Sequence, residues 1–360
     1  MLKRFEVIGY KNFRERFILD FSNTRDYQYN MECIREGLIN TAIIYGKNAV
    51  GKTNFGRAVL DVRKNVIVMN NDANYLNADM ETNTVEFKYV FVFDGKEVEY
   101  IYEKNDQGHL MHEKLFIQHK LIFDYDHIEK SLVDESLELV GAQTLNWEFT
   151  NHTHSIFSYI VNNTSLSDHH PLRKTHQFIL GMSMIQGNLL LSKSAKLERI
   201  IKDIIDEDMV EDFEIFLNKY GIDEKLIVVN TSIGDKILCF YHKKPISFIQ
   251  NCSSGTASLV RLYSWIKKVE NATFLYLDEF DAFYHYELSE KVIETIKGIQ
   301  TCQTILTSHN TDLLSNKLMR PDCFFILTKE KMSSFADATA RELREGHNLE
   351  KLFKSGEFNE

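Results

Sequence analysis

Residues 46–53, GKNAVGKT, carry the most specific chemical pattern in the sequence. The pattern matches G-x-x-x-x-G-K-[ST], in which glycines let backbone N–H groups converge on phosphate oxygens. It follows a short apolar segment at 40–45 and precedes a helical pattern at 54–67, the order of strand, loop and helix N-terminus. Lys52 is expected to reach the β and γ phosphates of a nucleotide, and the Thr53 hydroxyl to ligate Mg²⁺. The two glycines of this phosphate loop are Gly46 and Gly51.

Two carboxylates follow an apolar segment far along the chain. The segment 274–277, FLYL, is followed by Asp278 and Glu279. A strand covered on both faces would deliver these acids at its carboxyl end, where open α/β sheets bind ligands. Asp278 would then hold Mg²⁺ through a water molecule, and Glu279 would orient or deprotonate the attacking water. Taken alone, the acids could also be solvated residues that cap a strand end.

A histidine ends the next strand-like segment, 304–308, which is followed by His309. A single histidine is more often an ordinary surface or core residue. The 30 residues that separate Glu279 from His309 leave room for one helix and one adjacent strand. That spacing would bring His309 beside the acids, where it could donate a hydrogen bond to a γ-phosphate.

Small hydroxyl residues precede a helical pattern at 256–268. Ser253, Ser254 and Gly255 would form an anion-binding helix N-terminus. Alone they are no more than an ordinary helix cap. Their position 23 residues before Asp278, behind the loop and ahead of the acids, makes the segment diagnostic.

This set of motifs, in this order, resembles the ATPase head of the ABC superfamily, and among its branches the RecF, SMC and overcoming-lysogenization-defect group. The opening segment 5–13, FEVIGYKNF, resembles the N-terminal strand of these heads, and Asn48 matches the asparagine of their phosphate loop. A closer resemblance is to the AAA-type ATPases of bacterial abortive-infection and anti-phage systems, including the ATPase subunit of phage anti-restriction-induced defence. The segments that carry it are 249–259, 276–288, 307–310 and 320–322.

The resemblance implies a head-to-tail dimer or higher oligomer in which two subunits enclose two ATP molecules with Mg²⁺. One subunit would supply Lys52, Thr53, Asp278, Glu279 and His309, and the other the signature segment Ser253, Ser254 and Gly255. Asp281 falls where the D-loop of the family crosses the interface, although it could equally cap a helix.

Three features depart from the family or stay open. Ser254 stands where transporters have glycine and Thr256 where they usually have glutamine, which weakens a transporter interpretation. Gln118 is only a guess for the glutamine that the family places near the nucleotide. Tyr10 and Phe13 are candidates to stack on adenine, and either could equally belong to the core.

The composition describes a compact protein. The chain has 360 residues, of which 44% are hydrophobic and three are proline, so a disordered or low-complexity chain is excluded. The formal charge of −10 disfavours adhesion to nucleic acid by the whole surface and leaves room for a local basic patch. Candidates for such a patch are Arg173, Lys174, Lys193 and Lys196.

The chain is expected to be cytoplasmic and to have no membrane contact. Its five cysteines are scattered without a C-x-x-C pair, and its first residues lack a signal-peptide pattern. The uncharged stretch 175–192 is too polar to span lipid and is expected to form a buried helix. Five histidines between 152 and 176 lack metal-site spacing and are expected at a polar surface.

The pattern of elements predicts an α/β fold, an ABC-type P-loop ATPase head with a mostly parallel sheet, an antiparallel β meander and a helical insertion. Asp94-Gly95 between alternating segments marks the meander, and alternating strands and helices after 256 mark the parallel sheet. The head would comprise 1–126 and 221–360, and 127–220 would form a helical lid or arm. No long heptad array is present, so the extended coiled coils of SMC proteins are excluded.

These features favour an ATPase sensor or scaffold of an anti-phage defence system that controls a separately encoded effector, a nuclease or toxin. No second catalytic pattern follows His309. The trigger would be a phage protein or DNA. A RecF-like DNA-maintenance ATPase that clamps DNA is the alternative, and a transporter nucleotide-binding subunit ranks last.

Overall fold

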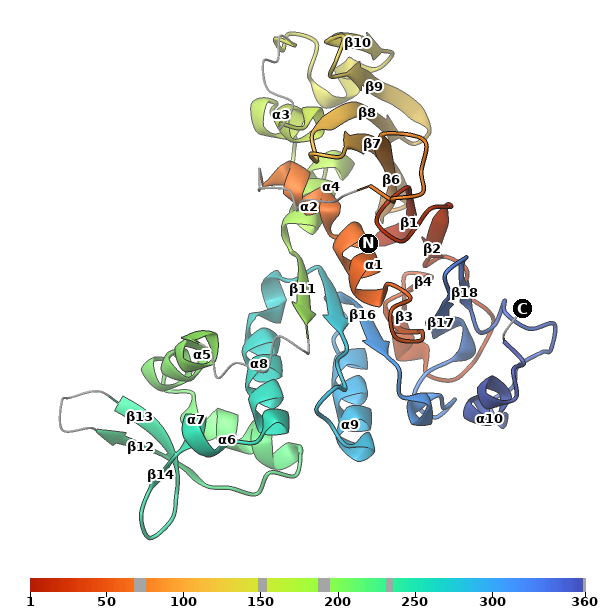
Figure 1. Ribbon diagram of the computed structural model, residues 1–360. Coiled ribbons are helices and arrows are strands. Elements are labelled where there is room, and N and C mark those ends of the chain that lie inside the picture. Colours follow the sequence, from red (N-terminus) through yellow and green to blue (C-terminus); the bar gives the residue numbers. More distant parts are fainter. Residues whose placement is uncertain (68–75, 148–153, 187–194, 231–235, 359–360) are drawn as a thin grey trace.

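The computed structural model describes residues 1–67, 76–147, 154–186, 195–230 and 236–358. Two large sheets organise this part of the chain, and a smaller lobe projects from one of them (Figure 1).

The first sheet is antiparallel and has seven strands. The turn Asp94-Gly95 has φ values of 51° and 72°, both left-handed, as a two-residue hairpin turn requires. The predicted meander is confirmed. In spatial order the strands are β10 (Ser131–Asp134), β9 (Lys120–Asp126), β8 (Leu110–Ile117), β7 (Lys96–Asn105), β6 (Thr84–Phe93), β1 (Leu2–Ile8) and β2 (Phe17–Asp20).

The second sheet has six strands, parallel except for β18 at one edge. Its central strands are buried along their whole length, which explains their continuous apolar sequences. In spatial order they are β11 (Met182–Gln186), β15 (Phe274–Asp278), β16 (Gln303–Ser308), β5 (Thr41–Tyr45), β17 (Phe324–Leu327) and β18 (Met332–Ser334).

Helix α1 (Lys52–Val59) lies between the two sheets (Figure 1). On one side Phe55 meets the ring of Phe5 in β1 edge-on, at 5.6 Å between centroids. On the other, the hydroxyl of Tyr276 in β15 donates to the Lys52 carbonyl at 2.7 Å. Gly56 allows this approach, because a Cβ there would lie 2.4 Å from the Tyr276 ring.

We predict that Gly56→Ala destabilises the protein although alanine favours helices. The added methyl group would overlap the buried Tyr276 ring, and overpacking of a core costs about 1–3 kcal/mol. Urea unfolding monitored by circular dichroism measures the change. Gly346→Ala is the control, since a Cβ at Gly346 meets nothing within 4 Å. Equal stability of the two variants would contradict the packing argument.

The segment 127–220 is not purely helical, which corrects the prediction of a helical lid. β10 belongs to the antiparallel sheet and β11 to the parallel sheet. The expected helix at 175–192 ends at Leu180, and Met182–Gln186 pairs with β15 instead. The open edge of β15 provides backbone partners that outweigh the local pattern. Whether an insertion begins at 127 and ends at 220 stays a prediction. Helices of this segment are α3 (Ile156–Asn163), α4 (Pro171–Leu180), α5 (Ala195–Asp206) and α6 (Val210–Lys219).

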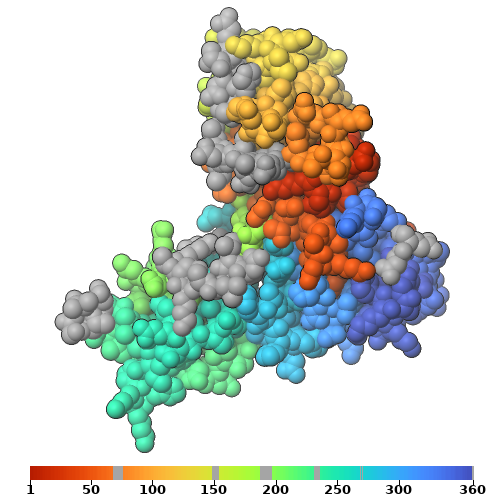
Figure 2. Space-filling view, viewed as in Figure 1, coloured from red at the N-terminus to blue at the C-terminus, as the bar shows by residue number. Residues whose placement is uncertain are grey.

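The projecting lobe consists of α5, α6, α7 (Phe248–Asn251) and a three-stranded sheet beside helix α8 (Ser254–Lys268) (Figure 1). In the space-filling view its green and teal residues stand out from the rest of the molecule (Figure 2). Helix α5 packs one apolar face inward, since Leu197, Ile201 and Ile204 are buried. The other elements of the chain are β12 (Leu226–Asn230), β13 (Lys236–Phe240), β14 (Ile246–Ser247), α7 (Phe248–Asn251), α8 (Ser254–Lys268), α9 (Tyr286–Lys297), α10 (Leu349–Lys354), α2 (Asp61–Val66), β3 (Ile34–Arg35) and β4 (Leu38–Ile39).

None of the described helices is long and apolar enough to cross a membrane. Within the same residues, no group of three His, Cys, Asp or Glu side chains could hold a metal ion. His170 caps α4, and His176 is buried with its pKa lowered by burial. His152 and Lys193 lie outside the described residues.

Candidate active site

Three parallel strands bring the motifs of the sequence to one edge of the parallel sheet. β16 lies between β15 and β5, and Ser308 pairs with Tyr45. The phosphate loop, the two acids and His309 therefore leave the sheet at neighbouring carboxyl ends. The expectation of one helix and one adjacent strand between Glu279 and His309 is confirmed by α9 and β16.

The phosphate loop is tightly curled. Ala49 and Gly51 have left-handed φ values of 65° and 105°. A Cβ on Gly46 would lie 2.8 Å from the Leu327 carbonyl oxygen, so the loop starts against β17 with no space for a side chain. Gly51 is therefore required by its backbone conformation, and Gly46 by the close approach of the Leu327 carbonyl.

Lys52 is folded back onto this loop. Its Nζ donates to the Gly46 carbonyl at 2.7 Å and to the Lys47 carbonyl at 3.4 Å. Burial lowers the pKa of Lys52, and the nearby carboxylates of Glu279 and Asp278 oppose that effect. The ammonium is thus held over the loop by weak carbonyl acceptors, which the more strongly charged oxygens of a phosphate can replace.

Thr53 and Asp278 are in direct contact although 225 residues separate them. The Thr53 hydroxyl donates to Asp278 Oδ2 at 2.6 Å, and the carboxylate is 1% exposed. A hydroxyl and a carboxylate are hard oxygen ligands, and Mg²⁺ usually takes one or two carboxylates together with waters and phosphate oxygens. The residues present therefore fit Mg²⁺.

Thr307 positions both acids, which the sequence analysis did not recognise. Its hydroxyl donates to Asp278 Oδ1 at 2.9 Å and accepts from the Glu279 N–H at 2.7 Å. Glu279 has φ 50°, uncommon for a residue with a side chain, and is half-buried. Among the described residues its carboxylate has no hydrogen-bond partner, so it is available to a water molecule.

We predict that Thr307→Val lowers kcat about tenfold with little change in the Kd for ATP, because Val keeps the shape but removes a hydrogen bond worth about 1 kcal/mol from each acid. Steady-state hydrolysis and equilibrium nucleotide binding separate the two effects. Thr304→Val in the same strand is the control, since its buried hydroxyl makes only weak contacts with Cys302. Similar losses in both variants would assign the effect to general packing.

A hydrogen bond connects the loop after β15 with the end of β16. Ser308 Oγ donates to Asp281 Oδ2 at 2.6 Å and accepts from the Asn310 N–H at 2.9 Å. Burial raises the pKa of Asp281, and its other oxygen has no hydrogen-bond partner. His309 follows Ser308 directly and is exposed. His309 is therefore adjacent in sequence to the residue whose hydroxyl binds the Asp281 carboxylate.

The signature segment forms the N-terminus of α8. The Ser253 side chain caps the helix by accepting from the Thr256 N–H at 3.0 Å, and Ser254 and Gly255 occupy its first turn. A Cβ on Gly255 would lie 3.0 Å from the carbonyl oxygen of Phe283, so this turn lies against the loop that follows the acids. Both the cap and the close approach require small residues here.

Two sequence guesses need correction. Gln118 lies in the turn between β8 and β9, with φ 49°, and accepts a hydrogen bond from the Glu97 N–H at 3.3 Å, so it belongs to the hairpin. Tyr10 and Phe13 are fully buried and cannot stack on adenine. The sequence around Tyr10 and Phe13 alternates between apolar and polar residues, and this pattern does not distinguish a core residue from a ligand-binding residue.

Gln186 is a residue that the sequence analysis did not consider for the site. It ends β11 directly opposite Asp278 in the parallel register. The available signal was a short apolar segment followed by Gln-Gly, which the prediction of a single helix over 175–192 concealed. Gln186 and Asp278 also line one cavity, together with residues of α8 and α9.

The two sheets, the helix between them and the order of motifs at the sheet edge define an α/β domain with a P-loop nucleotide site. A family model described as "AAA domain, putative AbiEii toxin, Type IV TA system" matches residues 42–315. The chain belongs to this family, whose model covers well over half of it. A search of curated proteins finds no match.

Solved structures with a similar fold include several SMC heads. The SMC head domain from Thermotoga maritima is 12% identical, with a TM-score of 0.47, 92% of this chain covered and 98% of that chain. The Smc head from Pyrococcus furiosus bound to the C-terminal domain of ScpA is 14% identical, with a TM-score of 0.48 and 98% of both chains covered. The Smc head with a coiled coil and joint from Pyrococcus yayanosii is 12% identical, with a TM-score of 0.49 and 98% of both chains covered.

Proposed function

We propose that this protein binds and hydrolyses ATP between two subunits and that the cycle controls a separately encoded effector of an anti-phage defence system. The observation that carries the ATPase part is the 2.6 Å contact between Thr53 and Asp278, with Lys52 folded over the adjacent loop. A side chain of the phosphate loop and a side chain of the acid segment are thus in direct contact.

The chemistry follows from the protein groups. Lys52 would exchange its carbonyl acceptors for β- and γ-phosphate oxygens. Thr53 and Asp278 would hold Mg²⁺, which would neutralise phosphate charge. Glu279 accepts a proton from water, and Thr307 keeps both acids in position. His309 donates to the γ-phosphate. Gln186, opposite Asp278, contacts the same region from the edge strand.

The second subunit would complete the site. The N-terminus of α8, with Ser253, Ser254 and Gly255, offers unpaired N–H groups and a positive dipole end to a γ-phosphate. Asp281 would lie at the same interface. ATP would therefore join two heads in a head-to-tail dimer or a higher oligomer, and hydrolysis would release them.

A role in a defence system with a partner protein is supported by the family description, which names a type IV toxin–antitoxin system. A nuclease or toxin encoded nearby would supply the damaging activity, in the cytoplasm, after a phage protein or DNA triggers the ATPase.

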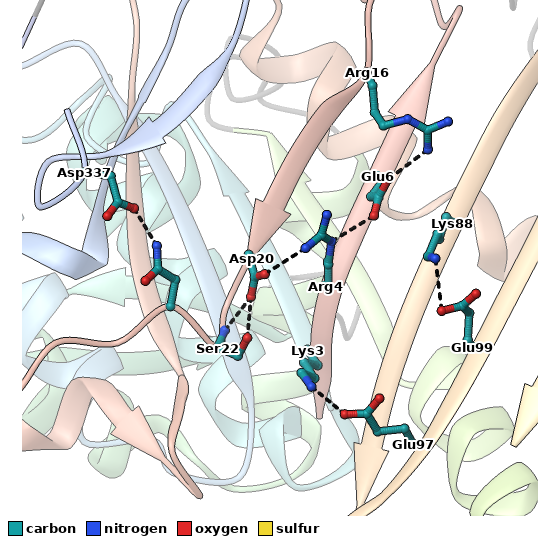
Figure 3. A network of polar contacts seen from close by, with 11 residues as sticks. Lys3, Arg4, Glu6, Arg16, Asp20, Ser22, Lys88, Glu97, Glu99 and Asp337 are labelled. Atoms are coloured by element: carbon teal, nitrogen blue, oxygen red, sulfur yellow. Dashed lines mark hydrogen bonds and ion pairs between the residues drawn. The ribbon is translucent and has the colours of Figure 1, made fainter. Parts of the chain in front are cut away.

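The DNA-clamping alternative has less support. On the antiparallel sheet, cations pair with neighbouring acids (Figure 3). Arg4 and Arg16 each donate to Glu6 at 2.8 Å, and Lys88 lies 3.0 Å from Glu99. Lys174, one of the expected basic residues, pairs with Asp94. Cations that are already paired contribute little to phosphate binding.

The test combines three measurements on the full chain: ATP turnover, mass in solution with and without ATP, and co-purification with the neighbouring gene product. We expect turnover, an ATP-dependent increase in mass and a stable complex. A monomer without a partner and without effect on phage plating would contradict the defence role. Salt-sensitive, ATP-dependent binding to DNA ends would favour the RecF-like alternative.

A further inference from the structure

The turn between β1 and β2 contacts the phosphate loop through the side chain of Asn12. Asn12 Nδ2 donates to the Val50 carbonyl at 2.8 Å, and its Oδ1 accepts from Asn54 Nδ2 at 2.9 Å. Val50 precedes Gly51, and Asn54 lies in the first turn of α1. One amide therefore bridges both sides of the second glycine of the loop.

The turn that carries Asn12 is held firmly. Tyr10 and Phe13 on either side of it are fully buried, and the Phe13 N–H donates to the Tyr10 carbonyl at 2.8 Å. The Phe13 ring also meets Phe55 of α1 edge-on, at 5.8 Å between centroids. Asn12 itself is exposed, but its backbone is fixed by the core of the antiparallel sheet.

The contact with Val50 sets the direction of the next peptide N–H. The peptide group is planar and trans, so its C=O and N–H point in opposite directions. With the Val50 carbonyl held toward Asn12, the Gly51 N–H points away from Asn12. A Cβ on Gly51 would lie 2.2 Å from Asn12 Nδ2, so the amide also occupies the space that a side chain would need.

We propose that Asn12 is a positioning residue that holds the phosphate loop in its binding conformation before the nucleotide arrives. This inference rests on the proposed nucleotide binding, and it assigns the antiparallel sheet a role in that binding. A loop that is already ordered pays less conformational entropy on binding. Because Asn12 acts on the loop and not on the reacting atoms, it affects the affinity for ATP and ADP equally.

The main experiment compares Asn12→Ala with wild type. We expect the Kd values for ATP and ADP to rise about tenfold, the loss of one to two hydrogen bonds, with kcat at saturating ATP within about twofold. Hydrogen exchange of the amides at 49–52 should be faster in the nucleotide-free variant. Asn12→Asp should bind as weakly or more weakly, because its carboxylate faces the Val50 carbonyl without a donor.

Two further variants make the comparison specific. Asn54→Ala should have a smaller effect, and it should add nothing to Asn12→Ala, because the two amides act through one contact. Glu15→Ala in the same connection is the control, since its side chain is 76% exposed and lies only near Arg14. Glu15→Ala should keep wild-type affinity and exchange.

The outcomes are distinguishable. Unchanged Kd and exchange in Asn12→Ala would overturn the proposal, as would a fall in kcat with unchanged Kd, which would indicate contact with the reacting groups. If wild type binds no nucleotide, the proposed function fails. The exchange comparison in nucleotide-free protein still tests whether Asn12 orders the loop.

Discussion

Glu279→Gln is expected to accumulate as an ATP-bound dimer that hydrolyses ATP about 10²- to 10⁴-fold more slowly than wild type, the usual contribution of a general base. Glutamine keeps the shape of the side chain and cannot accept a proton from water. The variant leaves Lys52, Thr53 and Asp278 intact, so nucleotide binding persists. The dimer is then no longer released by hydrolysis.

Light scattering after gel filtration with Mg²⁺ and ATP measures the mass, and phosphate release measures turnover. Glu287→Gln is the matched control, because it removes the same charge from an exposed position at the start of α9. Equal turnover by wild type and Glu279→Gln would remove Glu279 from the role of base. A monomeric Glu279→Gln protein that still binds ATP would contradict the dimer.

The sequence predicted the site best where a short stretch of consecutive residues determines both the backbone conformation and the chemistry. The phosphate loop combines two glycines, each required by backbone conformation or close approach, with a buried strand before it and a helix after it. The acids follow a strand buried along its whole length. In both cases the chemistry and the backbone requirement lie within eight consecutive residues, so no distant contact is needed to recognise them.

The sequence was less informative where tertiary pairing decides the outcome. Met182–Gln186 becomes a strand only because β15 offers an open edge, and this pairing brings Gln186 opposite Asp278. Thr307 matters through contacts with residues 28 and 29 positions earlier. Asn12 likewise acts on a loop 38 residues away. Such contacts depend on the register of strands, which no local periodicity specifies.

Lys52→Ala is expected to lose nucleotide binding, with the Kd for ATP rising at least about 100-fold, because each charge-assisted hydrogen bond to a phosphate contributes about 1.5–3 kcal/mol. Lys52 also donates to the Gly46 carbonyl, so the variant loses a contact within the loop as well. The loss should abolish ATP-dependent dimerisation together with hydrolysis.

Thermal unfolding separates binding from folding in this variant. A ligand at 100 times its Kd stabilises the native state by about 2.7 kcal/mol, so ATP should raise the Tm of wild type and leave that of Lys52→Ala unchanged. Lys47→Ala is the control, since Lys47 is an exposed lysine of the same loop and should lose affinity only slightly. If Lys52→Ala retains the ATP-dependent rise in Tm, the loop does not bind phosphate through this lysine. If it binds ATP and stays monomeric, Lys52 acts in closure of the dimer instead of in capture of the nucleotide.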